Sequence, residues 1–281
     1  MANCVDYDAE YDDAEKYKIK ITTVHGTVFK LLFQQLALQA DEIKLLFSHD
    51  RIKINYYENA SSSIDVNIDN SNYAFKEFVC KKDIEIGINI KNVSHALRTI
   101  GVKDELTLYL KTISDKLDDV FGFILSGNIE TEYELNMIEL NDNNYEKQDD
   151  EYQCDIKMKS SDLNDIVSRL KAVGGDCVGI SLSGSVLTFT SVGDNGKASI
   201  SLNTGNYETN QQVNSLTKRP DIINIYINLT KLIDVVKFHT ITKTTVKLYL
   251  DNNKMFILEY PLLSLGTVKI GLAPILKPDN F

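Results

Sequence analysis

A pattern that occurs twice is the feature that most constrains the fold of this chain. Residues 88–110 read INIKNVSHALRTIGVKDELTLYL, and residues 227–250 read INLTKLIDVVKFHTITKTTVKLYL. Both stretches begin Ile-Asn-aliphatic and end Leu-Tyr-Leu, and the second is one residue longer than the first. The two lie half a chain length apart, whereas solenoid units recur every ~20–50 residues. The sequence therefore predicts two copies of one domain.

The composition is that of a globular chain. Its 281 residues are enough for two domains that each bury a core, and 43% are hydrophobic and 25% charged. No apolar run approaches the roughly 18 residues that span a bilayer, and the acidic start of the chain lacks an apolar signal core. We therefore expect neither membrane association nor export.

Charge and cysteine content bound the chemistry further. A net charge of −10 argues against nucleic-acid binding unless a basic surface exists locally. The four cysteines are scattered without a CxxC pair, which favours a reduced compartment and no zinc site. We expect no metal and no cofactor.

Hydrophobic periodicity predicts an α+β arrangement in each half. Helices are expected over 27–40 and 91–100 in the first half, and over 160–173 and 228–239 in the second. Thr27 and either Ser160 or Ser161 are candidate N-caps. We expect an acidic, flexible leader over 1–16, an N-terminal domain over 17–140, a polar connector over 141–151 and a C-terminal domain over 152–281.

Positively charged residues recur on the predicted helices. Aligning the two copies places Arg98 opposite Lys237, and the spacing of Lys91, His95 and Arg98 puts these three on one helix face. Such residues can form an ordinary solvated face, or together attract a phosphate backbone. Acidic residues on the same helices weaken the second interpretation. The other cations of the predicted helices are Lys30, Arg169, Lys171 and Lys231.

Motifs typical of enzymes are missing from the sequence. No GxSxG, P-loop, HExxH or GxGxxG pattern occurs, and the four histidines are isolated from one another. The run of acidic residues at 149–151 is better explained as a solvated connector than as a general acid–base pair. We therefore expect a protein without catalytic residues.

Several stretches, in their order and spacing, carry a family resemblance. They are INIKNVSHALRTIG at 88–101, YELNMIEL at 133–140, EYQCDIKM at 151–158, LEY at 258–260 and VKIGLAP at 268–274. With these, the chain resembles the DNA sliding clamp family of the eukaryotic and viral proliferating cell nuclear antigen type. The similarity runs from about Lys18 to Pro274.

The resemblance implies a DNA clamp fold with strands outside and helices lining a channel. It implies a head-to-tail homotrimer around double-stranded DNA, with residues 128–135 of one chain pairing with 196–203 of the next. Lys30, His95, Arg98 and Lys237 carry over as channel cations, and Lys91, Arg169, Lys171 and Lys231 lie on the same helices. The chain departs from the family at Leu31, Ala37, Asp165, Ser168 and Ala172, where basic residues are usual, so we expect a less positive channel.

The resemblance also implies a binding surface for partner peptides, beneath the connector and beside the C-terminal segment. Gly271 replaces a usual aromatic residue, and polar residues occupy connector positions that are mostly apolar in the family. Tyr145 is therefore either a plain surface aromatic or part of a remodelled pocket, and we favour the pocket. The expected partner-binding residues are Tyr57, Tyr145, Lys147, Met255, Leu272, Ala273 and Pro274.

The resemblance implies a DNA polymerase processivity factor that tethers replication and repair proteins, with a clamp loader as a further possible partner. The alternative keeps the fold but makes the chain a clamp-like scaffold, either a subunit of a heterotrimeric checkpoint clamp or a viral late-transcription cofactor. The abundance of Asn, Ile and Lys suggests an AT-rich genome, such as that of a large DNA virus. The expected location is the nucleus, or a cytoplasmic viral replication site if the chain is virus-encoded.

Overall fold

The computed structural model describes residues 16–58, 61–70, 73–113, 116–117, 120–140, 151–206, 208–211, 222–242, 244–279 and 281. The expected leader, apart from its last residue, and the expected connector, apart from residue 151, lie outside the described residues. The chain divides into two compact units. Unit 1 comprises Met1–Ile54 and Asn67–Asn141, and unit 2 comprises Asn55–Val66 and Asp142–Phe281.

The first set of elements opens with a strand, a helix and a run of strands. These are β1 (Tyr17–Thr23), α2 (Gly26–Leu36), β2 (Glu42–Phe47), β3 (Arg51–Glu58), β4 (Ser62–Asp69), β5 (Glu77–Cys80) and β6 (Ile84–Asn89). A second helix and the closing strands follow. They are α3 (Ile90–Ala96), the 3-10 turn η1 (Leu97–Thr99), β7 (Glu105–Ile113), β8 (Lys116–Leu117), β9 (Val120–Ser126) and β10 (Thr131–Asn136).

The second set of elements repeats this order. It begins with β11 (Cys154–Lys159), α4 (Ser160–Lys171), β12 (Cys177–Ser183), β13 (Val186–Gly193), β14 (Gly196–Asn203), the 3-10 turn η2 (Thr204–Asn206), β15 (Glu208–Gln211) and β16 (Ile222–Asn228). It ends with α5 (Leu229–Val236), α6 (His239–Thr242), β17 (Thr245–Leu250), β18 (Phe256–Pro261) and β19 (Gly266–Leu272).

Strand order confirms the predicted α+β duplication. The order β10-β9-β7-β1-β5 in unit 1 matches β19-β18-β17-β11-β15 in unit 2. Likewise, β4-β3-β2-β6 matches β14-β13-β12-β16. Each half of the chain is therefore the same fold, with corresponding elements in corresponding places.

The doubled sequence pattern has a physical role at both of its ends. Asn89 and Asn228 are the N-caps of α3 and α5, and their side chains accept hydrogen bonds from the backbone N–H of Asn92 and Lys231. Each cap ends a strand that runs directly into a helix. The Leu-Tyr-Leu end of the pattern lies in β7 and β17, which pair with the first strand of their own unit, β1 and β11.

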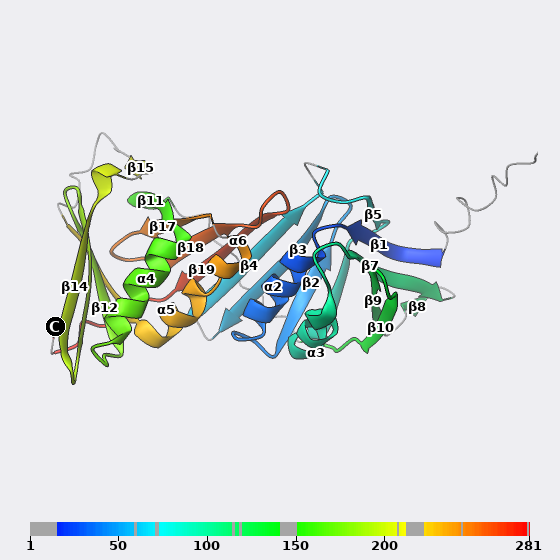
Figure 1. Cartoon of the computed structure of the whole chain (residues 1–281), viewed down its shortest axis with the longest axis horizontal. Coiled ribbons are helices and arrows are strands. Elements are labelled where there is room, and N and C mark those ends of the chain that lie inside the picture. The colour runs from blue at the N-terminus through cyan, green and yellow to red at the C-terminus, as the bar shows by residue number, and fades with distance from the viewer. Residues whose placement is uncertain are drawn as a thin grey trace, which may run out of the picture. The chain divides into compact units, whose positions relative to one another are not determined.

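Helices cover the strands within each unit. In unit 1, α2 packs beside α3, and in unit 2, α4 packs beside α5 (Figure 1). The helices bury one apolar stripe each, at the spacing of a helix with one face on a core. The stripes of α2 and α4 are Phe29, Leu32, Phe33 and Leu36, and Leu163, Ile166, Val167 and Leu170.

The structure corrects several local predictions. Thr27 is not a cap: α2 starts after His25, which makes no side-chain cap bond. Ser160 is the first residue of α4, and its hydroxyl donates to the Thr244 carbonyl, so it does not cap the helix. Strand β2 was not predicted, and the helix expected over 228–239 is α5 followed by the separate α6.

Candidate nucleic-acid interface and partner surface

In unit 1 the predicted cations lie on α2, α3 and η1. Lys30 donates from Nζ to the Ile100 carbonyl at 3.4 Å, which links α2 to the end of η1, and no carboxylate of the described residues forms an ion pair with it. The side chains of His95 and Arg98 are exposed, and no carboxylate in the described part of the chain forms an ion pair with either. Lys91 differs, because its Nζ lies 2.5 Å from Asp41 Oδ1.

In unit 2 the predicted cations lie on α4 and next to or on α5. Arg169 and Lys171 occupy the last turn of α4, where positive charge complements the helix dipole, and both are exposed. Among the described residues, neither makes an ion pair. Lys237 pairs with Asp234 at 2.7 Å, and Lys231 pairs with Glu58 at 2.7 Å.

The predicted cations therefore differ in how their charge is balanced. An ammonium bonded to a carboxylate contributes little net field, whereas an exposed, uncompensated cation is available to a phosphate. The doubled pattern explains part of this difference, because Asp234 of α5 stands where α3 has His95. Among the described residues, the predicted cations without a carboxylate partner are Lys30, Arg98, Arg169 and Lys171, and His95 lies on the same side of the helix as Arg98 in the sequence spacing.

The predicted partner surface is only partly described. Tyr145 and Lys147 lie outside the described residues. Tyr57 is half-buried, and its hydroxyl donates to Asp65 Oδ1 at 3.3 Å. Met255 is half-buried just before β18. Leu272 offers no apolar surface, because its side chain is 2% exposed and packs in the core of unit 2.

The segment after β19 carries apolar surface, of which the sequence predicted Ala273 and Pro274 but not Ile275 and Leu276. Ala273 is half-buried and Pro274 is exposed. Ile275 is 41% exposed and Leu276 is 92% exposed, so two large aliphatic side chains follow the proline on the surface. The sequence shows Ala-Pro-Ile-Leu at the end of the last predicted strand. No pattern in it distinguishes an exposed apolar segment from a buried one.

Gly271 has a steric reason for lacking a side chain. A β-carbon at this position would lie 2.5 Å from Ser63 Oγ and 3.3 Å from the Met255 thioether. Ser63 and Met255 therefore occupy the space that a larger residue at 271 would need. Glycine at 271, where the family usually has an aromatic residue, therefore fits the space that Ser63 and Met255 leave.

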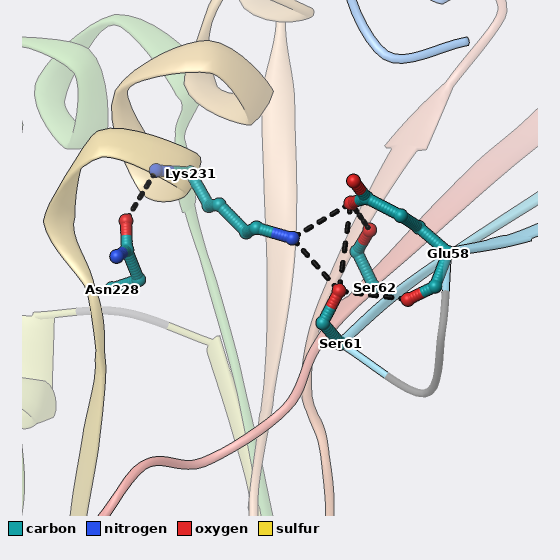
Figure 2. Close-up of polar contacts among 5 residues, drawn as sticks. All are labelled: Glu58, Ser61, Ser62, Asn228 and Lys231. Atoms are coloured by element: carbon teal, nitrogen blue, oxygen red, sulfur yellow. Dashed lines mark hydrogen bonds and ion pairs between the residues drawn. The ribbon is translucent and has the colours of Figure 1, made fainter.

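A polar cluster joins the β3–β4 turn to α5 within unit 2 (Figure 2). Lys231 reaches from α5 and donates from Nζ to Glu58 Oε2 at 2.7 Å and to Ser61 Oγ at 2.8 Å. Ser62 Oγ donates to the same Glu58 oxygen at 3.1 Å. The hydrogen bond from Lys231, opposed by partial desolvation, holds the pKa of Glu58 below its ordinary value. We call Glu58, Ser61, Ser62 and Lys231 the turn cluster.

Backbone hydrogen bonds connect the turn cluster to the C-terminal segment. Ala273 N–H donates to the Ser61 carbonyl at 2.9 Å, and Ile275 N–H donates to the Tyr226 carbonyl of β16 at 2.7 Å. Further along, the Phe281 ring packs edge-on against Tyr226, with centroids 5.3 Å apart. The segment from Ala273 to Leu276 is therefore fixed at two points of unit 2.

A duplicated α+β chain with cationic helices and an apolar surface beside its last strand has the features of a sliding clamp. Residues 19–145 match the family model of the proliferating cell nuclear antigen N-terminal domain, and residues 146–275 match that of its C-terminal domain. The chain belongs to the proliferating cell nuclear antigen family of sliding clamps.

Individual relatives agree with this assignment. The chain is 26% identical over 213 residues to proliferating cell nuclear antigen 2 of Drosophila melanogaster, a match that covers 74% of this chain and 78% of the relative. The crystal structure of the proliferating cellular nuclear antigen of Entamoeba histolytica matches with a TM-score of 0.79 at 22% identity. That match covers 92% of this chain and 100% of the other, and confirms the predicted clamp fold.

Two further properties concern the described residues alone. None of their helices is both long and apolar enough to cross a membrane. Across the same residues, no three His, Cys, Asp or Glu side chains are grouped so that they could hold a metal ion.

Proposed function

We propose that this protein is a DNA polymerase processivity factor that assembles as a head-to-tail homotrimeric ring around duplex DNA. It performs no chemistry itself. Encirclement keeps the clamp on DNA, and capture of a polymerase peptide raises the effective concentration of the polymerase at the template. DNA repair proteins that carry similar peptides would bind in the same way.

The strand order within this chain supports the ring, because one of its strand contacts can be repeated between chains. In unit 2, β19 neighbours β4, whose first residues belong to this unit. The strands that correspond to β19 and β4 are β10 and β14, and each of these has one neighbouring strand among the described residues. Pairing β10 of one chain with β14 of the next would repeat the β19–β4 contact between chains and cover both edges.

The exposed cations support a DNA-facing role for the helices. Arg98 on η1 and Arg169 and Lys171 on α4 are exposed, and Lys30 is half-buried without a carboxylate partner in the described part of the chain. A net charge of −10 disfavours tight binding. A ring needs little affinity, however, since its topology retains it on DNA, and we expect a weak, salt-sensitive contact.

Native mass spectrometry and DNA retention test the proposed ring. A mass near three times the 31.7 kDa chain, with retention on closed circular DNA and loss from linear DNA, is the expected result. A strict monomer, or a requirement for other subunits, would instead favour the clamp-like scaffold. Retention is measured with and without a cell extract that supplies a clamp loader, to test whether loading onto closed circular DNA depends on one.

Replacing Arg98 by alanine should weaken duplex binding and make it less dependent on salt. Removing one phosphate contact lowers the slope of log affinity against log salt by about 0.9. Fluorescence anisotropy with a labelled duplex over a salt series measures this slope. Lys237→Ala is the matched control, because Lys237 is already paired with Asp234, and its slope should change less. Equal slopes for wild type and Arg98→Ala would contradict the assignment.

Replacing Tyr145 by alanine should weaken binding of a polymerase-derived peptide. The proposed pocket uses this ring, which belongs to the connector, as apolar surface, and truncating an aromatic anchor removes buried area from the complex. Isothermal titration calorimetry gives the affinity, with Tyr73→Ala, a fully exposed tyrosine of unit 1, as control. An affinity equal to that of wild type would show that Tyr145 is a plain surface aromatic.

The location follows from the same proposal. A cellular clamp of this family would act in the nucleus, and a virus-encoded one at a cytoplasmic replication site. Imaging of a tagged chain during DNA synthesis distinguishes the two.

A further inference from the structure

We infer that Lys231 and Glu58 are positioning residues for partner binding, and that they act by holding the β3–β4 turn against the C-terminal segment. The inference rests on the proposed function, since it concerns how the clamp presents its surface to an extended client peptide. It assigns Lys231 to the partner surface and not to the DNA-facing set in which the sequence placed it.

A single ammonium group organises the turn. Lys231 Nζ contacts Glu58 and Ser61, while the Ser61 hydroxyl also donates to the Glu58 carbonyl at 2.7 Å. Ser62 adds its hydrogen bond to the Glu58 carboxylate. Side-chain and backbone groups of the turn thus close one network around the lysine (Figure 2).

The backbone of Lys231 is itself held in a fixed position. Its backbone N–H donates to the side chain of the N-cap Asn228 at 2.9 Å, which places Lys231 in the capped first turn of α5. Leu229 and Leu232 on either side are buried, so this turn of the helix is anchored in the core. Its side chain therefore extends from a rigid support.

Ser61 connects the turn to the partner surface. Its hydroxyl receives the Lys231 hydrogen bond, and its carbonyl accepts the N–H of Ala273 at 2.9 Å. Two residues further on, Ile275 is tied to β16. The exposed Pro274 lies between these two fixed points, and Leu276 follows. Without the Lys231 side chain, Ser61 would lose the hydrogen bond that fixes its position beside Ala273.

The paired charge of Lys231 suits positioning better than DNA binding. Lys231 and Glu58 are both partly exposed and neutralise each other at 2.7 Å, so neither presents a free charge to a phosphate backbone. Lys237, at the end of α5, is paired in the same way with Asp234, a residue of its own helix and not of the turn. The two lysines therefore form a matched pair for experiment.

The test compares Lys231→Met with Lys237→Met in the full-length protein. The probe is a synthetic extended peptide with an aliphatic–aromatic plug, and calorimetry gives its affinity. We expect Lys231→Met and Glu58→Gln to weaken peptide binding by about two- to fivefold, the range that a partly exposed ion pair supports. Lys237→Met should bind like wild type.

Rescue separates positioning from general loss of structure. Lys231→Arg should retain most of the affinity, and the exchanged pair Glu58→Lys with Lys231→Glu should bind more tightly than either single reversal. Thermal midpoint, native mass and the salt slope of duplex binding should remain those of wild type in Lys231→Met.

Unchanged peptide affinity in Lys231→Met, or an equal loss in Lys237→Met, would overturn the inference while leaving the proposed function intact. A lower salt slope in Lys231→Met would also overturn it and return the residue to the DNA-facing set. If wild type fails to bind the peptide at all, the partner-binding part of the proposed function fails, and the inference fails with it.

Discussion

Replacing Ile200 by aspartate is expected to convert the proposed three-chain ring into single chains. Ile200 lies in β14, at the edge of its four-stranded sheet, and is half-buried opposite the core residue Phe189. In the proposed ring, β10 of the next chain covers this edge and removes the new carboxylate from water. An unpaired buried charge costs about 3–5 kcal/mol, and the proposed ring would carry this cost at each of its three contacts. Native mass spectrometry measures the outcome, and retention on circular DNA should disappear with the trimer.

The opposite edge of the same sheet provides the control. Ile222 in β16 is 55% exposed, and Ile222→Asp introduces the same charge at an edge that the proposed contact does not use. That variant should keep the mass of wild type. Thermal unfolding of both proteins checks that the chain still folds. A trimer that survives Ile200→Asp would contradict the proposed β10–β14 contact.

Much of the fold was predictable because the doubled pattern marks structural transitions. Asn89 and Asn228 each end a strand and cap a helix, and their identical settings made the duplication visible without an alignment. Strand β2 escaped prediction for a local reason. The chain between Leu36 and Glu42 carries no Gly or Pro, so nothing in the sequence separates the end of α2 from the strand that follows.

Only part of the candidate site was predictable, because a pair of residues close in the sequence can be recognised from the sequence and a distant pair cannot. Lys237 and Asp234 are three residues apart, at the end of one helix, so their pairing can be read from the sequence. Lys231 and Glu58 are 173 residues apart, and only the fold brings them together. Leu272 was misplaced because the alternation of β19 ends in consecutive buried residues, where a period of two no longer distinguishes inside from outside.

Replacing Gly122 by alanine is expected to destabilise unit 1 by about 1–3 kcal/mol, the usual cost of overpacking a core. Gly122 of β9 lies opposite Tyr109 of β7, and a β-carbon there would overlap the Tyr109 ring. That ring is 2% exposed, and its hydroxyl donates to Glu132 and, at 3.1 Å, to Glu134 of β10. Burial and these two carboxylates raise the pKa of Tyr109, so the hydroxyl remains a donor at any physiological pH. Displacing the ring would strain both hydrogen bonds, and urea unfolding measures the resulting loss of stability.

The second copy of the fold shows why the penalty should be specific to this pair. Tyr249 corresponds to Tyr109, but the residue opposite it in β18 is Ile257, so the sheet itself accepts a large side chain at this register. In unit 1, by contrast, the Tyr109 ring lies over Gly122 and occupies the space that a β-carbon would need. Gly122→Ala should therefore cost less in a Tyr109→Leu background than in wild type, because leucine lacks the ring atoms that the β-carbon meets. Equal costs in the two backgrounds would show that Gly122 is required by the backbone of β9 and not by Tyr109.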